Sequence, residues 1–234
     1  MRGNSLTAQS IKAISLDLDD TLWPTGPALE AAEAKLHAWL ESHAPAVAAA
    51  LPPVEFAKFR RSLAAELPHI AHDFTALRLE AMKRALSLHR EDAGLAGSAL
   101  NVFLEARSEV ALYAEVPEAL ERLANRYPLI ALTNGNADIG RAGVGEYFDQ
   151  VVTPAIAGMA KPDPRIFHAA CSALGASPST VMHAGDHPDS DVRGAARAGL
   201  RAAWINRPRI AWVGDAEEFE EFHDLSALCD WLGV

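Results

Sequence analysis

Residues 11–24 read IKAISLDLDDTLWP, and this stretch decides the fold. Its first half, Ile11 to Leu18, is rich in Ile and Leu and ends in acidic residues, a pattern that predicts a buried β-strand followed by a polar loop. Residues 25–114 then become rich in Ala and Leu at helical spacing, and prolines and glycines divide them into about four helices. We therefore expect one strand followed by an all-helical insertion.

Beyond Pro117, helices and strands alternate. PEALERLANRY precedes the strand PLIALT, PRIFHAACSALG precedes TVMHAG, SDVRGAARAG precedes RAAWIN, and a short strand lies near QVVTP. This alternation implies right-handed crossovers and a parallel sheet that is covered on both faces. The predicted fold is an α/β, Rossmann-like core domain of residues 8–24 and 115–234, with a helical domain of residues 25–114 inserted after the first strand.

The composition narrows the class of protein. Half of the 234 residues are hydrophobic and 22% are charged, which describes a globular chain with a full core. The formal charge of −10 argues against binding to nucleic acid or to an anionic membrane. No run of about 18 apolar residues occurs, the polar first ten residues do not resemble a signal peptide, and two cysteines give no disulfide framework. We expect a cytoplasmic monomer or homodimer.

Chemically active side chains follow the predicted strands. They are Asp17 and Asp19 after the first strand, Thr133, Asn134 and Gly135 after PLIALT, Lys161 after QVVTP, and Asp186 and Asp191 after TVMHAG. Ligands of an open parallel sheet bind at the carboxyl ends of its strands. Four carboxylates, a hydroxyl–amide turn and a lysine should therefore converge at one edge.

This set of groups suits phosphoryl chemistry. Crowded carboxylates raise each other's pKa unless a cation lies among them, and ligands that are all oxygens favour Mg²⁺. A carboxylate at the metal can act as nucleophile, and Asp19, two residues after Asp17, could serve as acid and base. Thr133 to Gly135 suit phosphate oxygens, and Lys161 could offset the charge of the transferring group. Each signal alone is usual in an ordinary turn, so the prediction depends on their order along one sheet.

These segments resemble the four motifs of the haloacid dehalogenase-like hydrolase superfamily. Asp17-x-Asp19-x-Thr21 is similar to the first motif, Thr133 to the second, Lys161 to the third, and Gly185-Asp186 with Asp191 to the fourth. The resemblance implies that Asp17 is the nucleophile and Asp19 the general acid and base. Thr133 and Asn134 would hold the phosphoryl group, and Lys161 would steady both nucleophile and phosphate. Mg²⁺ would be held by Asp17, the main-chain carbonyl of Asp19 and Asp186, with Asp191 as an additional or water-mediated ligand, and the insertion would form a cap.

Several segments are similar, within this superfamily, to bacterial phosphatases of riboflavin synthesis that act on flavin mononucleotide and 5-amino-6-(5-phospho-D-ribitylamino)uracil. They are LDLDDTLW, PHIAHDFTALR, LTNGNADI, GVGEYFD and GDHPDSDVRGAARAGLRAAWIN. The expected partner is therefore a small phosphate ester, with His72 and Arg78 of the insertion contacting its leaving group. His187-Pro188 departs from the residues common in the fourth motif, which leaves the arrangement of the metal loop open.

Two other functions remain open at this point. L-2-haloacid dehalogenases share the fold and the nucleophile, but they need no metal and generally lack the second aspartate of the first motif. Asp19, Asp186 and Asp191 therefore favour a phosphatase. Phospho-accepting signalling modules also combine aspartates, threonine and lysine on a parallel sheet, but they are much shorter and have no insertion between their first strands.

Overall fold

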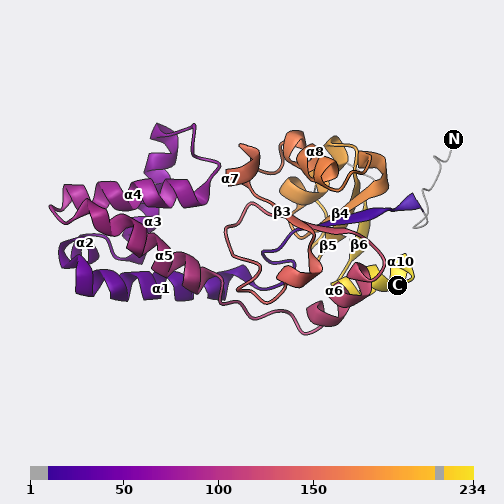
Figure 1. Ribbon diagram of the computed structural model, residues 1–234, viewed down its shortest axis with the longest axis horizontal. Helices are drawn as coiled ribbons and strands as arrows, with labels where there is room; N and C mark the ends of the chain where they lie inside the picture. The colour runs from indigo at the N-terminus through magenta and orange to yellow at the C-terminus, as the bar shows by residue number, and fades with distance from the viewer. Residues whose placement is uncertain (1–9, 214–218) are drawn as a thin grey trace. The chain divides into compact units, whose positions relative to one another are not determined.

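The computed structural model describes residues 10–213 and 219–234 (Figure 1), and the chain divides into two compact units. The sheet unit contains the residues up to Pro24, 111–134 and those from Val144 onward. The helical unit contains Thr25–Val110 and Gly135–Gly143. Residues 111–114 belong to the sheet unit, although the prediction placed them in the helical domain. Residues 135–143 belong to the helical unit, although the prediction placed them in the core domain. The domain limits stay a prediction.

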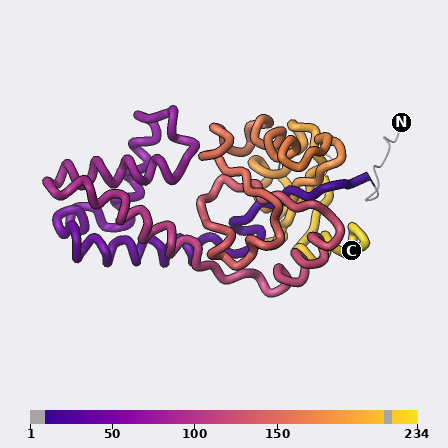
Figure 2. The backbone as a smooth tube through the Cα atoms, viewed as in Figure 1, coloured from indigo at the N-terminus to yellow at the C-terminus, as the bar shows by residue number. Residues whose placement is uncertain are grey.

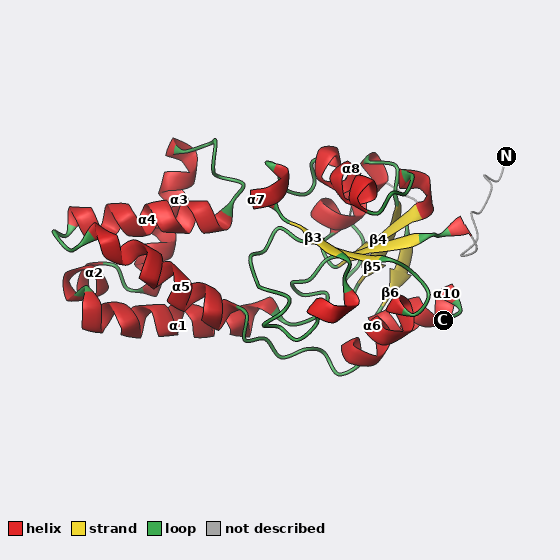
Figure 3. Ribbon diagram, in the orientation of Figure 1, coloured by secondary structure: helices red, strands yellow, loops and turns green. Residues whose placement is uncertain are grey.

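Six strands form one parallel sheet in the order β3-β2-β1-β4-β5-β6 (Figure 3), which confirms the predicted α/β fold class. The strands are β1 Ala13–Leu16, β2 Leu129–Leu132, β3 Gln150–Val152, β4 Val181–Gly185, β5 Arg201–Ile205 and β6 Glu220–Phe222. The central strand β1 pairs Leu16 with Ala131 of β2 and with Ala184 of β4. Every residue of β1 and β2 is buried, because helices cover both faces of the sheet.

Helices of the sheet unit lie on both sides of the strands (Figure 3). They are α6 Val116–Ala124, α7 Pro154–Ala157, α8 Pro164–Ala173, α9 Gly194–Arg197 and α10 Leu225–Leu232, with a π-helical turn at Pro188–Arg193. Phe167 of α8 and Ala195 of α9 share one apolar cluster with Ile130 of β2 and Val181 of β4. Helices α6 and α10 pack together on the opposite face.

The helical unit contains five α-helices, where the sequence pattern predicted about four. They are α1 Thr25–His43, α2 Pro45–Ala50, α3 Pro53–Glu66, α4 Phe74–Leu88 and α5 Ala96–Arg107. Pro45 and Pro53 each form the first residue of a helix, a position where the missing N–H costs nothing. No helix in the described part of the chain combines the length and apolar character that crossing a bilayer requires.

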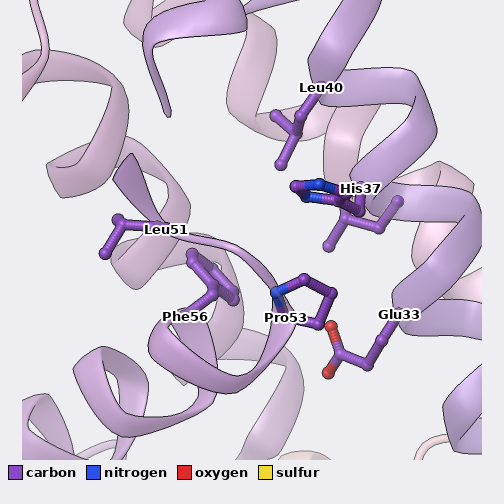
Figure 4. Close-up of a pocket in the computed structure, with 7 residues that line it drawn as sticks. Glu33, His37, Leu40, Leu51, Pro53 and Phe56 are labelled. Atoms are coloured by element: carbon purple, nitrogen blue, oxygen red, sulfur yellow. The ribbon is translucent and has the colours of Figure 1, made fainter. Parts of the chain in front are cut away.

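An ion pair between the buried Arg78 and the partly buried Glu33 joins α1 and α4 inside the helical unit. The Arg78 guanidinium donates to both oxygens of Glu33, at 3.1 and 2.6 Å, and lies 3.3 Å from the centroid of the Phe103 ring. Glu33 also borders a small, mostly apolar hollow between α1 and the start of α3 (Figure 4), lined by Glu33, Leu36, His37, Leu40, Leu51, Pro53 and Phe56. The Arg78 side chain is only 3% exposed. The Arg78 guanidinium is thus paired inside the helical unit, and its predicted contact with substrate stays a prediction.

Arg78→Met should destabilise the protein, because it leaves the Glu33 carboxylate without its main partner. Removing one member of a fully buried pair costs about 3 kcal/mol or more, and the cost here should be somewhat less, because Glu33 is 19% exposed and lies 3.7 Å from Arg60. The matched control is Arg84→Met on the same helix, because Arg84 forms exposed ion pairs with Glu80 and Glu66 that are worth at most about 1 kcal/mol. Urea unfolding curves of the two variants measure the difference, and equal losses would contradict a structural role for this ion pair.

The chain passes between the units four times, and the first two passages leave the sheet unit after Pro24 and return to it at Ala111 (Figure 2). Within the sheet unit the segments at these two passages are bonded to each other, because Tyr113 N–H donates to the Leu22 carbonyl at 3.0 Å. Arg207, after β5, holds both of them. Its guanidinium donates to the Thr21 carbonyl at 2.7 Å, lies 2.6 Å from a Glu115 oxygen and stacks on the Tyr113 ring. The ends of both segments are therefore fixed to the sheet unit.

Candidate active site

Three buried charged groups meet at the carboxyl edge of the sheet. Lys161 Nζ lies 2.6 Å from Asp17 Oδ1 and 2.6 Å from Asp191 Oδ1. All three side chains are at most 8% exposed. Thr21 Oγ1 approaches the other oxygen of Asp17 at 3.4 Å. The lysine therefore holds one oxygen of each carboxylate in a region from which water is largely excluded.

The strands and their first turns place these groups. Asp17 follows β1, and its N–H donates to the Ala184 carbonyl at 2.9 Å, which continues the β1–β4 ladder by one residue. Asp191 lies in the π-helical turn after β4 and folds back against Gly185. A Cβ at Gly185 would come within 2.4 Å of the Asp191 carboxyl carbon. Only glycine at position 185 therefore lets Asp191 approach the strand end.

Two further buried polar side chains, His183 and Ser15, lie on strands of the sheet next to Asp191. His183 of β4 contacts Asp191 Oδ1 through Nε2 at 3.2 Å and Ser15 Oγ of β1 through Nδ1 at 3.0 Å. The edge of its ring packs against Phe167. His183 is therefore a core histidine with both nitrogens hydrogen-bonded, as the apolar sequence around it suggests.

Burial controls the charges of this group. Burial raises the pKa of Asp17, Lys161 opposes that rise, and Asp191 and Asp186 add to it. Burial together with repulsion from Asp191 and Asp20 raises the pKa of Asp186 to about 7. Burial alone would also raise the pKa of Asp191, but Lys161 and His183 lower it well below its ordinary value. Three carboxyl groups thus share one ammonium group, and their mutual repulsion favours the binding of a proton or a further cation.

Asp17, Asp186 and Asp191 form a group that fits a divalent cation. Each offers a carboxylate oxygen within 4.8 Å of the others. Both oxygens of Asp191 already accept hydrogen bonds, Oδ1 from Lys161 and Oδ2 from the His187 N–H at 2.9 Å. Both oxygens of Asp17 likewise face a donor, Lys161 or Thr21, so the three carboxylates together form the candidate ligand set. An all-oxygen donor set of this kind suits Mg²⁺.

Mg²⁺ should raise the melting temperature, because a ligand that binds only the folded state stabilises it. At a hundredfold excess over its dissociation constant the gain is about 2.7 kcal/mol, or about 5 °C for a chain of this size. Asp186→Asn should abolish most of this shift, whereas the control Asp149→Asn, at an exposed position of the same unit, should keep it. A thermal melt with Mg²⁺ and with EDTA measures the shift, and an unchanged shift in Asp186→Asn would contradict the ligand assignment.

The side chain of Asn134, which is predicted to bind phosphate, is hydrogen-bonded to the backbone of Lys161. Its Nδ2 donates to the Lys161 carbonyl at 3.0 Å, and its Oδ1 accepts from the Lys161 N–H at 2.8 Å. The amide therefore fixes the backbone of Lys161, and its second Nδ2 hydrogen is the group that a phosphate oxygen could accept from. Thr133 is buried directly after β2, and Gly135 follows where the chain enters the helical unit. Phosphate binding by Thr133 and by the backbone of this turn stays a prediction.

Indole groups hold two of the predicted site residues. Asp19 is half-buried in the turn after β1, and its Oδ1 accepts from Trp23 Nε1 at 2.9 Å. Trp204 of β5 donates from Nε1 to the Asp186 carbonyl at 2.7 Å. Both tryptophans are buried. Trp23 lies four residues after Asp19 in a tight turn, and this short spacing was the feature of the sequence that could have indicated their hydrogen bond.

His187 and His72 occupy two different loops. His187 Nδ1 accepts from the N–H groups of Asp189 and Ser190, so its side chain caps the turn that carries Asp191. The unusual His187-Pro188 pair therefore still brings Asp186 and Asp191 together. His72 is half-buried just before Asp73, whose carboxylate caps the start of α4. Its contact with substrate stays a prediction.

The fold and this cluster define the class of enzyme. The chain belongs to the haloacid dehalogenase-like hydrolases, whose family model matches residues 11–199. It is 30% identical, over 83% of both chains, to the 5-amino-6-(5-phospho-D-ribitylamino)uracil phosphatase YigB of Escherichia coli K12. It is 39% identical, over 45% of both chains, to the phosphoserine phosphatase of Thermus thermophilus. The crystal structure of a 2-haloacid dehalogenase from Pseudomonas syringae superimposes with a TM-score of 0.90 at 38% identity, covering 95% of this chain and 98% of that one.

Proposed function

We propose that this chain is a phosphatase that uses Mg²⁺ and hydrolyses a small phosphate monoester through a phosphorylated Asp17. The supporting observation is the buried cluster itself, in which Lys161 lies 2.6 Å from Asp17, and Asp17 shares a group of carboxylates with Asp186 and Asp191. Phosphoryl transfer depends mainly on positioning and on offsetting charge. A held nucleophile, a fixed cation and a metal-binding set of oxygens supply both.

The residues of the chain would act in two steps. A carboxylate oxygen of Asp17 attacks phosphorus, the ester P–O bond breaks, and Asp19 gives a proton to the leaving oxygen. A water molecule then attacks the phosphorus of the acyl phosphate and gives its proton to Asp19, so that phosphate leaves and Asp17 is restored. Lys161 orients Asp17 and offsets charge, and Thr133 binds phosphoryl oxygens. Bound Mg²⁺ would supply further charge neutralisation at the phosphoryl oxygens.

Flavin mononucleotide or 5-amino-6-(5-phospho-D-ribitylamino)uracil is the substrate that we propose within this activity. The likeness to the Escherichia coli uracil phosphatase supports this choice, because it covers 83% of the chain. His72 is the residue that we propose to contact the leaving group of this substrate. The first turn of α4, which follows His72, is bonded to the segment after the proposed phosphate-binding turn, where Asn136 Nδ2 donates to Thr75 Oγ1 at 3.1 Å. This hydrogen bond therefore joins Thr75 at the start of α4, three residues after His72, to the segment that follows Thr133 in the sequence.

A 2-haloacid dehalogenase is the second candidate, and the 38% identical Pseudomonas syringae structure favours it. In that reaction Asp17 would displace a halide from carbon, and water would hydrolyse the resulting ester. Such a step needs no proton on the leaving group, because halide leaves as a stable anion. Asp19, fixed by an indole N–H beside the nucleophile, therefore supports the phosphatase.

Product release from a substrate panel tests the two proposals against each other. The panel contains flavin mononucleotide, the ribitylamino-uracil phosphate, phosphoserine, phosphoglycolate and (S)-2-chloropropionate, each with Mg²⁺ and with EDTA. We expect Mg²⁺-dependent phosphate release, with the highest kcat/KM on the first two compounds and no chloride release. Higher kcat/KM on phosphoserine or phosphoglycolate would contradict the proposed substrates and support only the more general proposal of a phosphatase. Chloride release that EDTA does not affect would instead establish the dehalogenase.

A further inference from the structure

The turn after β1 brings the indole of Trp23 onto the carboxylate of Asp19. Leu22 N–H donates to the Leu18 carbonyl at 2.7 Å, and Asp20 N–H donates to the Trp23 carbonyl at 2.8 Å. Asp20 has a φ of 59°, a left-handed conformation that reverses the chain and that Asp tolerates better than most residues. The turn thus sets Trp23 beside Asp19, with which it forms an isolated bridge.

The indole is fully buried, and this makes its hydrogen bond specific. Trp23 is 0% exposed, and its Nε1–H donates to Asp19 Oδ1 at 2.9 Å. A buried indole N–H needs an acceptor, because leaving it unsatisfied is costly. The packing of the ring therefore fixes the orientation of the carboxyl group that accepts the bond.

Indole nitrogen can donate a hydrogen bond but cannot accept one. The oxygen that faces Trp23 therefore acts as the acceptor, both in the carboxylate and in the neutral acid. In the neutral acid the indole N–H favours a carbonyl oxygen at Oδ1, because a carbonyl oxygen accepts more strongly than a hydroxyl oxygen, and it therefore favours the proton on the opposite oxygen, Oδ2. Trp23 would in this way determine which oxygen of Asp19 exchanges a proton with the reactants.

We propose that Trp23 is a positioning residue for proton transfer, which holds Asp19 so that Oδ2 delivers the proton to the leaving group. This inference rests on the phosphatase proposed above and adds a residue to its machinery. Proton delivery matters most when the leaving group is a poor one. An alkoxide must be protonated as it departs, whereas p-nitrophenolate leaves readily without a proton.

The test compares kcat/KM for two substrates in the Trp23→Phe variant, which keeps an aromatic ring and removes the N–H. The two substrates are p-nitrophenyl phosphate and an alkyl phosphate, flavin mononucleotide or another alkyl ester that the wild-type enzyme accepts. General acid catalysis contributes about 10²–10⁴-fold, and we expect loss of its orientation to lower kcat/KM for the alkyl ester about tenfold or more. We expect kcat/KM for p-nitrophenyl phosphate to fall less than about threefold, which is roughly the effect of a substitution that does not touch the reaction.

Two further variants separate positioning from general damage. In an Asp19→Asn background the Trp23→Phe change should have no additional effect on the ratio of the two substrates, because the acid is already absent. Trp231→Phe is the matched control, because Trp231 packs against Phe222 in the sheet unit, and its ratio should equal that of the wild type. If Trp23→Phe does not fold, benzothienylalanine at position 23 keeps the ring shape and replaces N–H with sulfur.

The possible outcomes are distinct. A selective loss on the alkyl ester, absent in the Asp19→Asn background, supports the positioning role. Equal losses on both substrates would overturn it and leave Trp23 as a packing residue in an active phosphatase. A wild-type enzyme that releases phosphate from neither substrate would overturn the proposed function, and this inference with it.

Discussion

Asp17→Asn is expected to reduce phosphate release at least about 10⁴-fold, because an amide cannot attack phosphorus as a carboxylate does. The substitution keeps the size of the side chain and its place beside Lys161. Far-UV circular dichroism should therefore show an unchanged fold. The measurement is steady-state phosphate release, combined with borohydride reduction of the wild-type enzyme during turnover. Reduction of an aspartyl phosphate produces homoserine, which mass spectrometry should locate at position 17.

Asp230→Asn is the control for this change, since Asp230 is exposed and pairs with Arg122 near the C-terminus. It should retain wild-type activity. Homoserine at Asp19 or Asp186 would contradict the assignment of the nucleophile. Substantial turnover by Asp17→Asn would contradict it as well.

Lys161→Met is expected to lower both stability and activity. The ammonium group lies between Asp17 and Asp191 with 2% of its side chain exposed, so its removal leaves two buried carboxylates facing each other. Breaking a buried pair of this kind costs about 3–5 kcal/mol. Loss of a cation that stabilises the transition state should reduce kcat by about 10²–10³-fold.

Unfolding curves and phosphate release measure the two effects in the same preparations. Lys35→Met is the matched control, because Lys35 forms an exposed pair with Glu109, and it should change stability by no more than about 1 kcal/mol. Mg²⁺ should restore more stability to Lys161→Met than to the wild type, because a second cation offsets the same carboxylates. A variant with wild-type stability and wild-type kcat would contradict the central role of Lys161.

The regular parts of the fold could be predicted from the sequence because they depend on local pattern. Short apolar runs alternating with helices predicted the parallel sheet, and alanine-rich helical spacing predicted the inserted helices. The pattern did not predict β6, whose three residues Glu220–Phe222 include two glutamates. Its pairing with β5 decides its structure, and pairing between distant segments leaves no local signal.

The sequence could predict only those parts of the candidate site that follow from the order of the strands in the sheet. Asp17 and Asp191 follow the neighbouring parallel strands β1 and β4, so the order of the strands was sufficient to bring them together. Lys161 comes after β3 and α7, and β2 separates β3 from β1, so its contacts with Asp17 and Asp191 depend also on the path of the loop that carries it. The partners of individual side chains were not predictable in this way. Asn134 bonds to a backbone 27 residues away and Arg78 to a carboxylate 45 residues away. Such pairs depend on packing that a one-dimensional pattern does not record.

The buried hydrogen bonds between Ser15, His183 and Asp191 have a consequence for how related sequences diverge. Burial lowers the pKa of His183, so its imidazole is neutral and has a single N–H. Asp191 is ionised and can only accept, which places that N–H on Nε2 and makes Nδ1 the acceptor of the Ser15 hydroxyl. Alanine at position 15 would leave Nδ1 without a donor, and an apolar residue at position 183 would leave the Ser15 hydroxyl without its acceptor. Among related chains, positions 15 and 183 should therefore change together, and an alignment of homologues would show them as a covarying pair on adjacent strands.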